Sequence, residues 1–216
     1  AAVFGRKAAY GEIKGNEGAD MDQEQEKTQA AGEGEKQEAK DADLFFWLQA
    51  LVTAVVVLTL LFTFVVRINR VDGHSMDNTL QHNELLLVWS LGYTPKAGDI
   101  VIVDKPTATI LRGNAIVKRV IATGGQTVDI DYENSTVYVD GQALDEPYIK
   151  ETMYLPGDPY MQQTHFEIPE GSVFVMGDNR NGSTDSRHEL VGAVDNSFVL
   201  GHAVFSFWPL SKAGTL

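Results

Sequence analysis

The sequence contains one long uncharged apolar segment, residues 44–66, "LFFWLQALVTAVVVLTLLFTFVV". A helix rises about 1.5 Å per residue, so this segment would span roughly 34 Å, slightly more than the hydrocarbon core of a bilayer. A buried helix of a soluble protein would need a far larger protein around it, and a cleaved signal peptide has a shorter apolar part nearer the start. The segment therefore predicts a transmembrane helix that anchors the chain in a lipid bilayer.

The residues before this segment, 1–43, are rich in Glu, Gln, Lys, Gly and Ala and have few large apolar side chains. Such a composition cannot bury enough apolar surface to fold, so we expect a disordered acidic tail. The chain begins with Ala1, and Met21 could serve as its initiator. Residues 1–20 are therefore expected not to be native.

The part after the apolar segment, residues 67–216, is long enough for one domain with a sizeable core. Its 11 Lys and Arg against 19 Asp and Glu lack the basic footprint of nucleic-acid binding. The absence of cysteine excludes disulfides, thiolate zinc sites and cysteine nucleophiles. Asp77, Asp178 and Asp185 have no histidine or glutamate at ligand spacing, so no metal site is predicted.

Short β-branched runs separated by turn signals predict a mainly β fold for this domain. The runs are residues 85–89, 99–104, 115–121, 126–131, 135–144, 172–178 and 202–208. In the fifth run Asp140-Gly141 predicts a tight type I′ hairpin, because both residues tolerate positive φ. The proline-rich stretch from Glu146 to Glu170 predicts an irregular excursion, and we treat residues 126–171 as an insertion.

The first candidate for chemistry is Ser75, in "RVDGHSMDNTLQHNELLLVWS" (residues 70–90), within ten residues of the apolar segment. A serine nucleophile needs a base, commonly histidine. His74 is adjacent to Ser75, and neighbouring side chains on an extended chain point to opposite faces, so His74 is poorly placed. Any of the other four histidines could still be the base: His82, His165, His188 or His202. The alternative interpretation is that Ser75 is an ordinary loop serine.

A different base is offered by the run "AIVKRVI", residues 115–121. On a strand, Lys118 shares a face with Ile116 and Val120, whereas Arg119 lies on the opposite face. Desolvation lowers the pKa of a buried lysine and makes a neutral amine available, which arginine cannot provide. Lys118 is therefore a candidate general base. The alternative is an edge-strand lysine with its amine in water.

The third feature is the polar segment "GDNRNGSTDSR", residues 177–187, which directly follows an apolar strand. It is dense in hydrogen-bonding groups, and a polar turn is the simplest interpretation. However, Asp185 and Arg187 are two residues apart and can face the same way and pair, and Ser183 is short enough to orient a nearby amine.

These three segments, in this order after a single amino-terminal span, resemble the type I signal peptidases, which are Ser/Lys membrane proteases. "GHSMDNTL" is similar to the family's nucleophile segment, "GDIVIVDKP" to the next, "AIVKRVIATGG" to the lysine strand and "GDNRNGSTDSR" to the last. Position by position, the resemblance implies Ser75 as nucleophile and Lys118 as general base. It also implies Ser183 as the residue that orients the lysine, with Asp185 and Arg187 as a supporting ion pair.

The resemblance further implies a supporting role for Asp178 and substrate contacts for Gly73 and Val117. Gly73 has no hydroxyl, so the oxyanion hole would depend on backbone N–H groups, chiefly that of Ser75. Two departures from the family are Asn78, where proline is usual, and the absence of a proline near the "ATGG" turn. Neither departure removes a reacting group.

The implied activity is that of a membrane-bound serine endopeptidase that removes signal peptides from exported preproteins after A-x-A-like sites, without a cofactor. The expected partners are preprotein signal peptides and the lipid bilayer, not nucleic acid, and a monomer is expected. The implied location is the cell membrane in a single pass, with a cytoplasmic amino terminus and an extracytoplasmic catalytic domain. Positive charges on the two sides of the span nearly balance and leave the orientation open.

Two rival functions differ in class. A self-cleaving repressor would share a Ser/Lys core but would carry a DNA-binding part, for which residues 1–43 have neither the helical pattern nor the basic charge. A membrane-anchored β-domain could instead bind peptides without cutting them, since a fold alone does not establish an activity.

Overall fold

The structure, a computed structural model, describes residues 43–216, so the predicted tail lies outside the described residues apart from its last member. One described helix, Asp43–Phe64, is long and apolar enough to cross a membrane. It ends two residues before the predicted boundary, because Val66 already belongs to a strand. Hydropathy does not mark this end, since Val65 and Val66 are as apolar as the helix that they follow.

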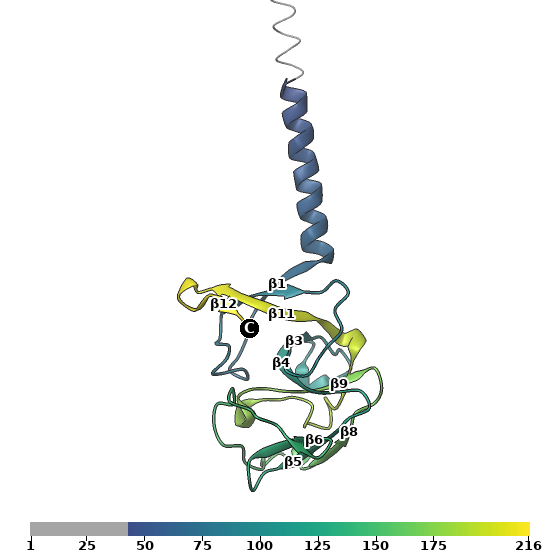
Figure 1. Cartoon of the computed structure of the whole chain (residues 1–216), viewed down its shortest axis with the longest axis vertical. Coiled ribbons are helices and arrows are strands. Elements are labelled where there is room, and N and C mark those ends of the chain that lie inside the picture. The colour runs from purple at the N-terminus through teal and green to yellow at the C-terminus, as the bar shows by residue number, and fades with distance from the viewer. Residues whose placement is uncertain (1–42) are drawn as a thin grey trace, which may run out of the picture. The chain divides into compact units, whose positions relative to one another are not determined.

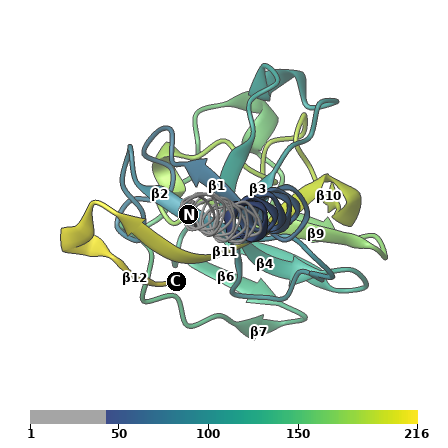
Figure 2. The ribbon, with the colours of Figure 1, turned by 90° about the horizontal axis from the view of Figure 1, so that it is seen from above.

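The larger of two antiparallel sheets has eight strands, in the order β1-β2-β11-β3-β4-β9-β10, with β12 paired to β11. Their bounds are β1 Val66–Arg70, β2 Leu85–Trp89, β3 Ile100–Val103, β4 Ile116–Thr123, β9 Ser172–Met176, β10 Val194–Asp195, β11 Val199–Trp208 and β12 Gly214–Thr215. Figure 2 shows β9 and β10 side by side at one edge of this sheet. β4 is an interior strand, because it pairs with β3 on one side and β9 on the other.

The smaller sheet has the order β7-β6-β5-β8. Its strands are β5 Thr127–Asp131, β6 Thr136–Val139, β7 Gln142–Ala143 and β8 His165–Glu167. It is built from the chain between β4 and β9, and Figure 1 shows β5, β6 and β8 grouped together apart from β3 and β4. The hairpin prediction is confirmed, since Val139 pairs with Gln142 and the turn residues Asp140 and Gly141 have φ of 51° and 75°.

The mainly β prediction is confirmed, and each of the seven predicted runs contains a strand. The sequence did not predict four of the strands, which are β1, β8, β10 and β12. β10 and β12 are two residues long, which is too short for alternation to be recognised. The other regular elements within residues 43–216 are five 3₁₀ helices, η1 Thr109–Leu111, η2 Pro159–Met161, η3 Arg180–Gly182, η4 Asn196–Phe198 and η5 Leu210–Lys212.

Candidate active site

The link between β1 and β2 carries Ser75 and is held by its own apolar side chains. Met76 and Leu80 are almost fully buried and pack in one cluster with Leu86 of β2 and Ile102 of β3. The Leu80 N–H also donates to the Met76 carbonyl at 2.8 Å. Ser75 itself is only half-buried. Val71, which precedes the serine, belongs to the same cluster, so the loop is anchored by core packing on both sides of the serine, while the serine remains accessible.

Lys118 lies on β4 opposite Val101 of β3 and is only 2% exposed. Its position on an interior strand shows that the edge-strand alternative is wrong. The Lys118 Nζ donates to Ser75 Oγ at 2.7 Å and to the Val117 carbonyl at 3.0 Å. Two residues that are 43 positions apart in sequence are thus in direct hydrogen-bond contact.

The environment of Lys118 favours its neutral form. The pKa of Lys118 is lowered to about 8, chiefly by burial; the charge of Arg187 also lowers it, whereas the carboxylates of Asp185 and Asp178 partly oppose this shift. Removal of an ammonium from water disfavours its charge, which accounts for the dominant effect. About a tenth of Lys118 is therefore unprotonated at pH 7, far more than for an ordinary lysine, and this neutral amine can accept a proton from a hydroxyl.

The histidine alternatives find no support in the geometry. Within residues 43–216, Lys118 is the hydrogen-bond partner of Ser75 Oγ. His74 lies 3.4 Å from an Asp77 oxygen, and His82 Nδ1 accepts from the Gly73 N–H at 3.1 Å. The other three, His165, His188 and His202, contact Asp129, Tyr160 and Tyr93, respectively.

The predicted pairing of Asp185 and Arg187 is confirmed. Arg187 donates to the two Asp185 oxygens from Nε at 2.8 Å and Nη2 at 2.9 Å, and both side chains are fully buried. Burial alone would raise the pKa of Asp185, but the charge and hydrogen bonds of Arg187 hold that pKa below its usual value. The pair also accepts from the Gly177 N–H and donates to the Arg180 carbonyl, so it fixes the loop that follows β9.

Ser183 is buried beside the nucleophile loop, and its role stays a prediction. Its Oγ has no hydrogen-bond partner of good geometry among the described residues. The backbone of Gly177 passes close to it: a Cβ on Gly177 would lie 2.6 Å from the Ser183 Cβ and 2.5 Å from the Ser75 carbonyl oxygen. Only glycine fits at position 177 without displacing one of these serines.

Asp178 connects the base strand to the nucleophile loop. Its buried carboxylate accepts from Arg119 Nε at 2.9 Å and Nη2 at 2.7 Å, and also from the Thr79 hydroxyl. The Arg119 guanidinium in turn lies 4.0 Å from the centre of the Tyr148 ring. Charge-assisted bidentate pairs of this kind fix geometry as well as charge. Arg119, which cannot serve as a base, therefore acts as a tether between β4 and the nucleophile loop.

Asn179 binds the backbone carbonyl groups immediately before and after the Cα of Ser75. Its N–H donates to the Ser75 carbonyl at 3.0 Å, and its Nδ2 donates to the His74 carbonyl at 2.9 Å. Nothing in the spacing of the polar segment marks Asn179 as different from Asn181. The contact was missed because it joins two loops across a tertiary interface.

The two predicted substrate-contact residues lie beside the dyad. Gly73 has a φ of +99°, and a Cβ there would meet nothing within 4 Å. Val117 is half-buried on β4. Their contacts with substrate stay predictions. Residues 43–216 contain no group of three or more His, Cys, Asp or Glu side chains arranged to hold a metal ion.

Comparison with known proteins gives consistent matches over most of the chain. Residues 44–208 match the family model "Signal peptidase, peptidase S26". The chain is 38% identical to a probable signal peptidase I-1 of Synechocystis, over 77% of this chain and 83% of the relative. It is 36% identical to signal peptidase I of Bacillus licheniformis, over 82% of this chain and 95% of the relative.

A crystal structure of a signal peptidase I from Enterococcus faecalis is also similar, at 29% identity, with 51% of this chain and 97% of that chain covered and a TM-score of 0.39. The family match covers the nucleophile loop, the lysine strand and the polar segment after β9. This chain therefore belongs to the signal peptidase family, peptidase S26.

Proposed function

We propose that this protein removes amino-terminal signal peptides from exported preproteins, with Ser75 as nucleophile and Lys118 as general base. The observation that carries the proposal is the 2.7 Å hydrogen bond between the Ser75 hydroxyl and a buried amine whose pKa is lowered to about 8. Family membership supports a serine peptidase and does not favour the non-catalytic peptide-binding domain.

In this mechanism Ser75 Oγ attacks the scissile carbonyl carbon while Lys118 Nζ takes the hydroxyl proton. The Ser75 N–H has no acceptor among residues 43–216, so it is free to donate to the oxyanion of the tetrahedral intermediate. Lys118 then gives its proton to the leaving amine, and an acyl-enzyme remains. A water molecule that Lys118 deprotonates attacks the ester and releases the signal peptide, and Ser75 regains its proton.

The supporting residues keep these groups in place. Asp178 and Arg119 tether the nucleophile loop to β4, and the buried pair of Asp185 and Arg187 supports the segment that contacts Ser75. Arg187 also contributes to the low pKa of Lys118. We expect the substrate backbone to lie against Gly73 and Val117, which flank the dyad in the chain.

The direct test is cleavage of a preprotein by the purified protein in detergent, followed by sequencing of the new amino terminus. We expect the new terminus to follow an Ala-x-Ala segment. A Ser75→Ala variant prepared in the same way is the control for contaminating proteases. Equal cleavage by this variant, or cleavage at unrelated sites, would contradict the proposal.

The pH dependence of kcat/KM should report the Lys118 base. Only neutral Lys118 can accept the serine proton, and its pKa is lowered to about 8, so kcat/KM should fall about tenfold per unit as the pH drops below that value. Measurement on a short Ala-x-Ala peptide from pH 5 to 10 gives the profile. A flat profile, or a midpoint near the ordinary histidine pKa of about 6.5, would remove Lys118 from this role.

We also propose the membrane topology: the tail before Asp43 is cytoplasmic, the helix Asp43–Phe64 spans the cell membrane once, and residues 67–216 lie outside. The apolar helix supports membrane anchoring, and the orientation would bring the dyad to the side where exported preproteins emerge. Protease added to intact cells should digest the carboxyl-terminal domain and spare the tail. Digestion of the tail alone would reverse the orientation.

A further inference from the structure

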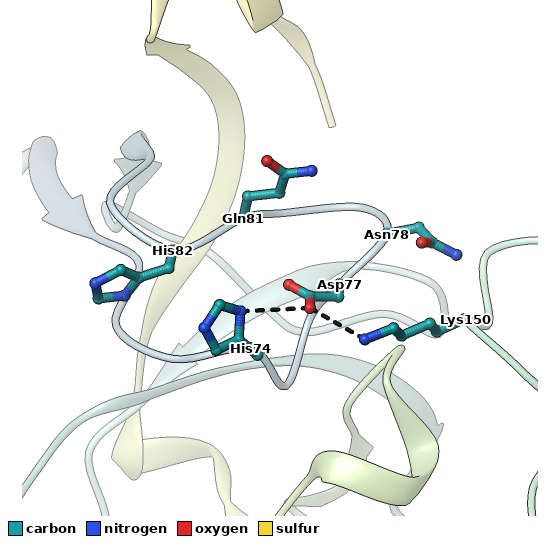
Figure 3. Close-up of a pocket in the computed structure, with 6 residues that line it drawn as sticks. All are labelled: His74, Asp77, Asn78, Gln81, His82 and Lys150. Carbon is teal, nitrogen blue, oxygen red and sulfur yellow. Dashed lines mark hydrogen bonds and ion pairs between the residues drawn. The ribbon is translucent and has the colours of Figure 1, made fainter.

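A pocket beside the nucleophile has no role in the mechanism given above. It has a volume of about 330 Å³ and is lined by His74, Asp77, Asn78, Gln81, His82 and Lys150. Five of these residues belong to the loop that carries Ser75, and His74 is its immediate neighbour in the chain. Figure 3 shows His74 and Lys150 approaching the same oxygen of Asp77 from opposite sides.

The pocket contains one carboxylate, one ammonium and two imidazoles, and the Nδ1 of His82 accepts a hydrogen bond from the Gly73 N–H. Its single carboxylate, Asp77, faces the Lys150 ammonium at 3.3 Å and the His74 imidazole at 3.4 Å, and His82 adds a second imidazole to the lining. Both contacts are long for charge-assisted pairs, and an ammonium has three donors. Lys150 can therefore bind a second carboxylate without releasing Asp77. The pocket therefore offers one ammonium with free donors, Lys150, in a domain in which acidic residues are in excess.

Two uncharged donors add to this capacity. The side-chain amides of Asn78 and Gln81 make no hydrogen bond to any other residue within 43–216, and both residues are exposed. Each amide can donate to a carboxylate oxygen or to a peptide carbonyl.

The pocket is also fixed relative to the nucleophile. The Lys150 N–H donates to the Asp178 carbonyl at 3.0 Å, and the Thr79 hydroxyl donates to the Asp178 side chain. Asp178 therefore binds both the segment that carries Lys150 and the loop that supplies the other lining residues. The adjacent Asn179 binds the Ser75 carbonyl. A group bound in the pocket would have a defined position with respect to Ser75 Oγ.

We infer that this pocket binds an acidic side chain from the part of the preprotein that follows the scissile bond, and that Lys150 determines this preference. The inference rests on the proposed function. Ser75 Oγ faces Lys118 of β4, the strand to which we assign signal-peptide contact, and no residue of β4 lines the pocket. The signal peptide would thus lie along β4, and the leaving segment would pass over the loop of residues 74–82.

The test compares cleavage of matched peptides by the full chain in detergent. Each peptide has the same Ala-x-Ala segment and carries Glu, Gln or Lys at one of the first three positions after the cleavage site. We expect Glu at one position to raise kcat/KM about 5-fold over Gln, the size of a partly exposed ion pair, and Lys to lower it. Lys150→Glu should reverse this order, so that the Lys peptide is cut faster than the Glu peptide.

The ratio between peptides is compared within each variant, so a general loss of activity in Lys150→Glu does not affect the result. Lys96→Glu, which makes the same change of charge at an exposed position outside the pocket, should keep the parent preference. Equal cleavage of the three peptides at every position, a parent preference for Lys, or the same Glu preference in Lys150→Glu would overturn the inference. Failure to cut any Ala-x-Ala peptide would instead overturn the proposed function.

Discussion

Ser75→Ala, Lys118→Ala and the double variant are expected to lose cleavage activity by nearly the same factor, at least about 10⁴-fold in kcat. Ser75 Oγ and Lys118 Nζ share one hydrogen bond of 2.7 Å, and attack by the hydroxyl requires transfer of its proton to the amine. Loss of either group stops the same step, so the second substitution has little left to remove. Single-turnover cleavage of a labelled preprotein measures all three variants on one scale.

Lys118→Arg separates proton transfer from charge. Arginine keeps the positive charge but cannot be deprotonated in a protein, so we expect it to be as inactive as Lys118→Ala. Lys96→Arg is the matched control at an exposed site and should retain parent activity. Rescue by arginine at position 118, or losses that add in the double variant, would show that Lys118 supplies only an electrostatic contribution.

Arg187→Met is expected to lower the free energy of unfolding by about 3–5 kcal/mol and to abolish most activity. The substitution removes the guanidinium partner of Asp185, which is fully buried and accepts two hydrogen bonds from the Arg187 side chain. An unpaired carboxylate in that position must either stay charged without compensation or take up a proton. Denaturation with urea, followed by the fluorescence of the domain's tryptophans, gives the change in stability.

Two further variants test this explanation. Asp185→Leu combined with Arg187→Met removes both charges, so the double variant should be more stable than Arg187→Met alone. Asp129→Asn breaks a pair with His165 that is exposed on the small sheet, and it should change stability far less. If Arg187→Met were as stable as the parent, the buried pair would not be what holds the segment after β9.

The sequence predicted those parts of the molecule that depend on local pattern. Alternation along "AIVKRVI" placed Lys118 on an apolar face, and the structure confirms that it is buried on an interior strand. The Asp140-Gly141 turn was predicted because two adjacent residues suffice to define it. Contact between Ser75 and Lys118 could be expected only from family resemblance, since no local rule joins residues 43 positions apart.

The contacts that the sequence did not predict lie mainly between loops. Asn179 positions the nucleophile through hydrogen bonds to two backbone carbonyl groups. Every residue type has the same carbonyl, so such a contact cannot be recognised from the sequence. Arg119 was considered only as a possible base, although its partner Asp178 had been predicted as a supporting residue. Neither pairing follows from spacing, because each requires knowledge of how the segment after β9 folds back over the loop of Ser75.

The position of β11 has a consequence for biosynthesis. In the large sheet this strand lies between β2, which follows the nucleophile loop, and β3, which pairs with the strand of the base. β11 spans Val199–Trp208, so it leaves the ribosome after β2, β3 and β4. The two halves of the sheet can join completely only after β11 has been synthesised, because non-local strand pairing must wait for its last partner. A nascent chain would thus remain inactive as a protease until β11 has left the ribosome.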